Sequence, residues 1–143
     1  MLADLSLNRL TAIIIEAAMA VHRALGPGLL ESAYITCLIF ELRRRGLKVE
    51  EQRPVPLNYC GVKLDCGYRL DLVVEGLVIV EVKALERFAP IHTAQMLTYL
   101  RLTNCPVGLL LNFNAPILKE GLKRVLNTRS TVDSGTGQPN THD

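Results

Sequence analysis

The segment that most constrains the fold of this chain is an almost unbroken apolar run, residues 77–83, that ends on charged residues. A run of this kind is typical of a strand that is covered on both faces, as in a sheet with helices on either side. Glu81 and Lys83 lie two positions apart on this strand, so their side chains point to the same face. Charges at such a position are costly without partners, and the run therefore predicts a polar site at the end of a buried strand.

Asp71 is the nearest candidate partner, on a predicted strand that precedes Glu81 by ten positions, with a turn at Glu75 and Gly76 between them. Directly opposed residues of an antiparallel pair share a face. A two-residue loop would place Asp71 opposite Val80, pointing away from Glu81. A three-residue loop or one bulge would place it opposite Glu81, and Gly76 would permit such a bulge. The sequence leaves both registers open.

Two carboxylates and a lysine on one sheet face have a recognised chemical use. Carboxylate oxygens are preferred ligands of Mg²⁺ and Mn²⁺, and such an ion keeps several of its waters. A bound ion makes water easier to deprotonate and stabilises charge that develops on a phosphate, while a lysine orients the water and stabilises the oxyanion. The alternative is a structural salt bridge at the strand end, between Glu81 and either Lys83 or Arg69.

Hydrophobic periodicity predicts an α/β fold. Apolar residues recur at three- and four-residue steps over residues 6–25 and 29–45, which predicts two helices, the first capped by Ser6 and the second ended by Gly46. A third helix is expected at residues 93–103. The predicted strands are residues 49–56, 58–64, 68–74, 77–83 and 107–113, with turns at Pro54, Pro56 and Cys60-Gly61, whereas residues 117–126 are either a strand or a helix. This order predicts a mixed β-sheet flanked by helices.

The chain of 143 residues fits one domain, which we expect to span residues 1–127. Hydrophobic residues make up 49%, enough for a buried core. Residues 128–143 are rich in Ser, Thr, Gly, Pro, Asn and Asp, which predicts a disordered polar tail.

Charge and cysteine content exclude several function classes. The 16 basic residues barely exceed the 14 acidic ones, so binding nucleic acid by overall charge alone is not expected. Four cysteines without a CxxC pair, and only three histidines, give no zinc-site spacing. The N-terminal residues carry an acid and no basic segment, and no run reaches the length of a membrane span. We therefore expect a protein of the reducing cytoplasm without a membrane partner.

The second predicted helix opens with a distinctive segment, residues 26–34, of sequence GPGLLESAY. Glu31 and Tyr34 share a helix face. Taken alone, Glu31 would stabilise the first turn through the helix dipole, and Tyr34 would be an aromatic at the edge of the core. The spacing Gly28-x-x-Glu31-x-x-Tyr34, however, resembles the signature of the GxxExxY proteins. Three further blocks resemble that family in the same order, residues 68–76, 80–85 and 109–113, and the match covers roughly residues 8–126.

The resemblance implies a PD-(D/E)XK nuclease-like fold, with a restriction-endonuclease-like core, of the type seen in bacterial proteins. In that superfamily an acid on a helix joins an Asp and a Glu-x-Lys element of the sheet. By position, the resemblance implies that Glu31 is the helical acid, Asp71 the metal-bridging acid, Glu81 a second ligand and Lys83 the catalytic lysine. It also implies Mg²⁺ or Mn²⁺ as the cofactor.

Gln95 and Tyr99 lie four positions apart on the next predicted helix and resemble the Gln-x-x-x-Tyr element of RecB-like members. Residues at this spacing share a face, so both are candidates for the same catalytic site. Taken alone, such a pair is typical of a helix surface. The chain departs from the family at Ile35 and Thr36, where relatives tend to be acidic, and we expect no catalytic consequence.

Other candidates have simpler interpretations. His22 either faces the site or has a capping or core role, and His92 is expected to be a cap or a surface residue. A basic cluster is a candidate for phosphate contacts, although such a run is more often a solvated helix end. Its members are Arg43, Arg44, Arg45 and Lys48.

Two classes of function follow. The first is a divalent-metal-dependent nuclease that hydrolyses phosphodiesters of DNA or RNA. The second is a catalytically silent protein on the same fold, which binds metal or assembles as a homo-oligomer. An aromatic content of 5%, without Trp, leaves few stacking surfaces for single strands and favours the second class. A symmetric homo-oligomer is compatible with either.

Overall fold

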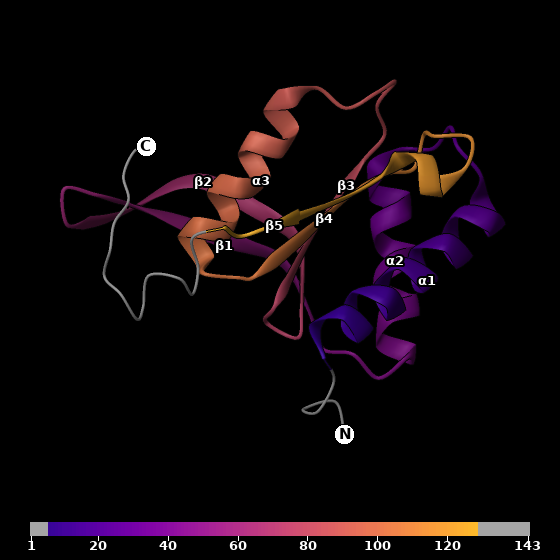
Figure 1. Cartoon of the computed structure of the whole chain (residues 1–143), viewed down its shortest axis with the longest axis horizontal. Coiled ribbons are helices and arrows are strands. Elements are labelled where there is room, and N and C mark those ends of the chain that lie inside the picture. The colour runs from indigo at the N-terminus through magenta and orange to yellow at the C-terminus, as the bar shows by residue number, and fades with distance from the viewer. Residues whose placement is uncertain (1–5, 129–143) are drawn as a thin grey trace.

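In the computed structural model, residues 6–128 are described and fold into three helices and a five-stranded sheet (Figure 1). The elements are, in chain order, α1 (Leu7–Leu25), α2 (Glu31–Arg44), β1 (Val49–Tyr59), β2 (Val62–Val74), β3 (Val78–Lys83), α3 (Pro90–Thr103), β4 (Val107–Asn112), the 3₁₀ helix η2 (Leu118–Gly121) and β5 (Leu122–Leu126). The expected disordered tail falls almost wholly on residues 129–143, outside the described part of the chain.

The strands are ordered β1-β2-β3-β4-β5. Neighbours are antiparallel except for β3 and β4, which are parallel and joined through α3. This confirms the predicted α/β class with a mixed sheet. It also places β3 at the centre, where the long apolar run requires it.

Helices cover both faces of the sheet, as Figure 1 shows, with α1 and α2 on one side and α3 on the other. In β3, Val78, Val80 and Val82 pack into the cluster under α1 and α2, whereas Ile79 packs into the cluster under α3. Alternate residues of one strand therefore bury against opposite layers. Glu81 follows the parity of Ile79, so it belongs to the α3 face.

The prediction of three short strands between residues 49 and 74 is wrong, because this stretch forms one long hairpin of β1 and β2. The turn is at Cys60 and Gly61, which both have positive φ. Pro54 and Pro56 do not end β1, because β1 is an edge strand and tolerates residues without an N–H group. They instead coincide with a register shift in the pairing. The outer part of the hairpin is exposed and extends away from the body (Figure 1).

The segment at residues 117–126, for which the sequence allowed strand or helix, contains both. The 3₁₀ helix η2 leads directly into β5, which pairs antiparallel with β4 and forms the second edge of the sheet. Across residues 6–128, none of the helices is both long enough and apolar enough to span a bilayer.

Tyr34 fixes the connection between α1 and α2. Its buried hydroxyl donates to the carbonyl of Gly26 at 2.6 Å and accepts from the backbone N–H of Leu29 at 3.1 Å. Its ring stacks on Phe113, with ring centroids 4.5 Å apart. Gly28, within this turn, has φ +107°, a conformation that favours glycine. The Gly and Tyr positions of the signature therefore shape the turn that sets the start of α2 and the position of Glu31.

His22 has the core role expected of it. It is buried, its Nε2 lies 2.9 Å from the carbonyl oxygen of Ala115, and its ring lies against Phe113 with centroids 6.0 Å apart.

Replacing Tyr34 by Phe removes the hydroxyl that serves both Gly26 and Leu29. We expect Tyr34→Phe to lower the free energy of unfolding by about 1–2 kcal/mol, because two partly buried backbone groups lose their partner. Urea unfolding followed by circular dichroism measures this. Tyr59→Phe, at an exposed tyrosine of the hairpin, is the matched control and should leave the midpoint unchanged. Equal urea midpoints for Tyr34→Phe and Tyr59→Phe would contradict the role of the Tyr34 hydroxyl in holding the turn between α1 and α2.

Candidate metal centre

The connection between β2 and β3 decides the register that the sequence left open. Three residues, Glu75 to Leu77, separate Val74 from its partner Val78. The ladder continues back to the pair Leu72 and Val80, and the next position along each strand places Asp71 opposite Glu81. The three-residue alternative is therefore the correct one.

The carboxylates of Asp71 and Glu81 each accept a hydrogen bond from the backbone of the opposite strand. The N–H of Asp71 donates to Oε2 of Glu81 at 2.9 Å, and the N–H of Val82 donates to Oδ2 of Asp71 at 2.9 Å. The carboxylates thus join the two strands beyond the last ladder pair, Leu72 and Val80. Each carboxylate is held through one of its oxygens. Because both oxygens are bonded to the same carbon atom, the direction of the second oxygen is fixed as well.

Burial and mutual repulsion weaken the ionised forms of this pair. Glu81 is only 7% exposed, and its pKa is raised to about 7, first by burial and then by the charge of Asp71. The pKa of Asp71 is raised as well, mainly by burial, although the N–H of Val82 and the charge of Lys83 oppose that shift. A divalent cation would relieve the repulsion, so the chemistry of this donor pair fits such an ion.

Lys83 ends β3, is half-buried, and lies two residues after Glu81 on the same face. Its charge lowers the pKa of both acids, so it is close enough to act on them. Neither acid forms an ion pair within residues 6–128, and Arg69 pairs with Asp65 instead, at 3.4 Å. The described residues therefore do not form the strand-end salt bridge considered as the alternative.

Glu31, the first residue of α2, reaches the same end of β3 from the opposite layer. Its Oε2 accepts from the N–H of Ala84 at 3.2 Å, directly after Lys83. Its charge contributes to the raised pKa of both Asp71 and Glu81. Among residues 6–128, however, no three Asp, Glu, His or Cys side chains stand close enough together to enclose a metal ion. Glu31 lies beside the acidic pair with its carboxylate turned onto the backbone.

Tyr99 of α3 approaches the acids from the α3 face of the sheet, whereas Glu31 lies on the other side. It is partly buried, and its pKa is raised by burial, then by Glu81, with smaller contributions from Tyr68 and Asp71. Its hydroxyl therefore stays protonated at neutral pH and can donate a hydrogen bond. Gln95, one turn earlier, is exposed and lines a groove together with Tyr68 and Tyr99.

Two residues that matter at this site are not among the candidates from the sequence. Asn112 is buried at the end of β4, where its Oδ1 accepts from the N–H of Leu85 and its Nδ2 donates to the carbonyl of Leu85, both at 2.9 Å. It fixes the chain as it leaves β3. A buried Asn at the end of an apolar strand is a signal that it needs partners. The side chain of Gln52 on β1 lowers the pKa of the Asp71 carboxyl group, and nothing in the sequence marks this residue.

The remaining candidates have structural roles. His92 caps α3, where its Nδ1 accepts from the N–H of Ala89 at 2.9 Å. In the basic cluster at the end of α2, the three arginines form ion pairs with two acids. Arg43 pairs with Glu51 at 3.3 Å, and Arg44 and Arg45 both pair with Glu41.

Comparison with protein families agrees with this architecture. Residues 8–125 match the sequence model of the PD-(D/E)XK nuclease superfamily, and the chain belongs to that superfamily. Comparison with curated proteins and with solved structures gives no match. The narrower resemblance to the GxxExxY proteins stays a prediction.

The raised pKa of Glu81 predicts a pH dependence of stability. The folded pKa, about 7, lies above the ordinary value of 4.5, so the folded state binds the proton more tightly than the unfolded chain. The resulting stabilisation is present at low pH and is lost as pH rises from about 4.5 to 7. Glu81→Gln removes this proton-linked stabilisation. In metal-free buffer, the free energy of unfolding of the variant should therefore rise by about 2–3 kcal/mol relative to that of wild type between pH 5 and pH 8.

Urea unfolding at several pH values, with a chelator present, measures this difference. Glu16→Gln, an exposed acid on α1, is the matched control and should follow wild type across the range. If the Glu81→Gln and wild-type curves run parallel from pH 5 to pH 8, Glu81 does not have the raised pKa.

Proposed function

We propose that this protein is a divalent-metal-dependent nuclease, a phosphodiesterase that acts on nucleic acid. The observation that carries the proposal is the reciprocal pair of Asp71 and Glu81, with Lys83 two residues further on the same face. Membership of the PD-(D/E)XK nuclease superfamily supports it. Nucleic acid is the partner that this superfamily implies.

Asp71 and Glu81 would hold Mg²⁺ or Mn²⁺, and Glu31 is the third acid within reach of their charge. When bound, the ion supplies an acidified water and a positive charge against the phosphate. The two backbone hydrogen bonds keep the acids in place, so little reorganisation is needed on binding. The raised pKa of Glu81, about 7, means that binding displaces a proton from this group, and affinity should increase with pH.

Lys83 presents an ammonium group beside the two acids. In this mechanism its Nζ donates hydrogen bonds to the attacking water and to a non-bridging phosphate oxygen, where negative charge develops. The hydroxyl of Tyr99 stays protonated and donates to the same substrate group. Gln95 contacts the substrate further along the groove rather than the reacting atoms.

The second candidate is a self-assembling protein without catalytic turnover. It is favoured by apolar side chains on the outer hairpin, where Tyr59 is 68% exposed, Val62 53% and Leu64 43%. The adjoining β1 is an edge strand, which can pair with a second chain. In this candidate function the acidic pair binds metal for structure only.

Cleavage assays with Mn²⁺ separate the two candidates. We expect wild type to cut labelled duplex DNA, single-stranded DNA or RNA, and Lys83→Ala to be slower by about 100-fold or more, because the positive charge at the phosphate is lost. Asp71→Ala should also lose activity, and calorimetry should show weaker Mn²⁺ binding for that variant alone.

Lys119→Ala, at an exposed lysine of η2, is the control and should cleave like wild type. Urea unfolding verifies that each variant is folded. If wild type binds Mn²⁺ but cuts none of the three substrates, this result contradicts the proposed nuclease function and favours the self-assembling protein.

A further inference from the structure

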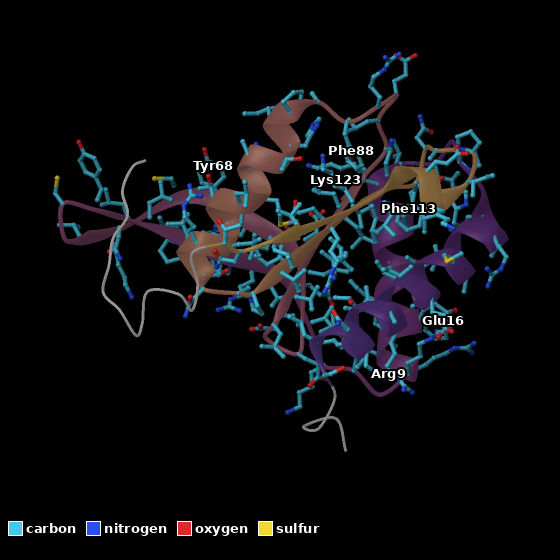
Figure 2. All side chains as sticks on the ribbon, viewed as in Figure 1. Arg9, Glu16, Tyr68, Phe88, Phe113 and Lys123 are labelled. Atoms are coloured by element: carbon cyan, nitrogen blue, oxygen red, sulfur yellow. The ribbon has the colours of Figure 1, made fainter. Side chains whose placement is uncertain are left out.

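A groove runs between the β1–β2 hairpin and α3, beside the acidic pair. Its volume is about 270 Å³, and its lining is mainly apolar. Tyr68 stands at its edge, 46% exposed, and Figure 2 places this ring beside α3. The lining residues are Leu57 and Tyr68 of the hairpin and Ile91, Ala94, Gln95, Thr98, Tyr99 and Leu102 of α3.

The groove is continuous with the candidate metal centre through Tyr99. This residue belongs to the groove wall, and it is also close enough to Glu81 and Asp71 for their charges to act on its hydroxyl. The rings of Tyr68 and Tyr99 lie 6.2 Å apart and are tilted by 60°. A ligand that extends from the acids along this face therefore meets the two aromatic rings.

We propose that the groove holds an unpaired nucleobase next to the phosphodiester at the acidic pair, an inference that rests on the proposed nuclease function. An exposed aromatic ring stacks on any base, and the Gln95 amide offers a donor and an acceptor to the edge of the base. A base inside a duplex has both faces covered by its neighbours, so only a single-stranded or extruded nucleotide can enter. The preferred substrate is therefore single-stranded.

Fluorescence anisotropy with a short labelled single-stranded DNA, in chelator, tests binding separately from cleavage. Tyr68→Ala should weaken binding about tenfold through the loss of one stacking contact, while Tyr68→Phe keeps it. Tyr59→Ala, on the same hairpin but outside the groove lining, should bind like wild type. Equal affinities of Tyr68→Ala and Tyr59→Ala, or tighter binding of duplex than of single strand, would overturn the inference and leave the metal-dependent cleavage assay unaffected.

A second inference concerns Gln52, whose backbone is strained. Its φ is +49°, in the left-handed region that a residue with a Cβ seldom adopts and that costs on the order of 1 kcal/mol. It lies within β1, where extended backbone is the rule. A strained residue persists only where the surrounding structure holds it.

The position of Gln52 explains what holds it. On either side of it, Glu51 pairs with Leu72 and Arg53 pairs with Leu70, so Gln52 stands opposite Asp71. Asp71 in turn stands opposite Glu81, and the three residues form one row across β1, β2 and β3. The Gln52 side chain is close enough to the Asp71 carboxyl group to lower its pKa, in keeping with this row.

We infer that Gln52 is a positioning residue that fixes the Asp71 carboxylate for the cation, and that its strained backbone is retained for this purpose. The Gln52 side chain acts on the Asp71 carboxyl group, whose pKa it lowers, while the N–H of Val82 holds Oδ2 at 2.9 Å. An amide beside the donor from Val82 would restrict the rotation of the carboxylate. Partners of this kind typically contribute 10–100-fold to metal affinity. The inference deepens the proposed function.

Gln52→Gly separates the two parts of the inference, because glycine accepts the positive φ but has no amide side chain. We expect its urea midpoint to rise and its Mn²⁺ affinity, measured by calorimetry, to fall about tenfold. If Gln52 had only a structural role, Gln52→Gly would lower the urea midpoint and the Mn²⁺ affinity together. Cys60→Gly, at φ +54° in the hairpin turn, is the matched control and should keep wild-type Mn²⁺ affinity.

Unchanged Mn²⁺ affinity in Gln52→Gly, with wild type binding normally, would overturn the positioning role alone. A lower urea midpoint in Gln52→Gly would overturn the assignment of strain. Wild type that binds no Mn²⁺ would overturn the proposed function and the positioning role together.

Discussion

The structure depends on one reciprocal interaction, in which Asp71 and Glu81 each accept a hydrogen bond from the strand opposite. The bonds from the N–H groups of Asp71 and Val82 join β2 to β3 beyond the last ladder pair, so the two strands stay connected where the site begins. Buried carboxylates without such donors would be far more costly. The same bonds fix both acids by one oxygen each, which gives the second oxygens a defined direction. Strand pairing and site geometry are therefore one feature of the molecule.

The end of β3 is also tied to the signature turn through a closed path of contacts. The N–H of Phe113 donates to the carbonyl of Lys83 at 2.9 Å, and its ring stacks on Tyr34. Tyr34 holds the turn that precedes Glu31, and Glu31 binds the N–H of Ala84, directly after Lys83. Figure 2 shows Phe113 near the end of the sheet, beside α2. A shift of Glu31 would thus disturb the end of β3, where Lys83 lies. The two segments are therefore coupled although they are more than fifty residues apart in the sequence.

The central strand, the α/β class and the Asp, Glu and Lys positions were predictable, because burial on two faces leaves a continuous apolar run and a charge that interrupts it needs partners. The register of Asp71 was not, because loop length at Glu75 and Gly76 is set by tertiary packing. The prediction of β1 is wrong because its prolines indicate turns in the sequence. An edge strand tolerates proline, and the sequence does not indicate which strand lies at an edge. Gln52 could not be found, because its signal is a backbone angle rather than a residue type.

Three costly features of this molecule lie in one row across the sheet. Gln52 has a strained backbone, Asp71 and Glu81 have raised pKa values, and Glu81 is almost wholly buried. Across residues 6–128, no buried side-chain nitrogen or oxygen lacks a hydrogen-bond partner. Natural folds break local rules mainly where function requires it. A left-handed backbone at Gln52, two repelling acids and a lysine on neighbouring strands are unfavourable for a purely structural sheet, and a divalent cation held by the acids would offset their repulsion.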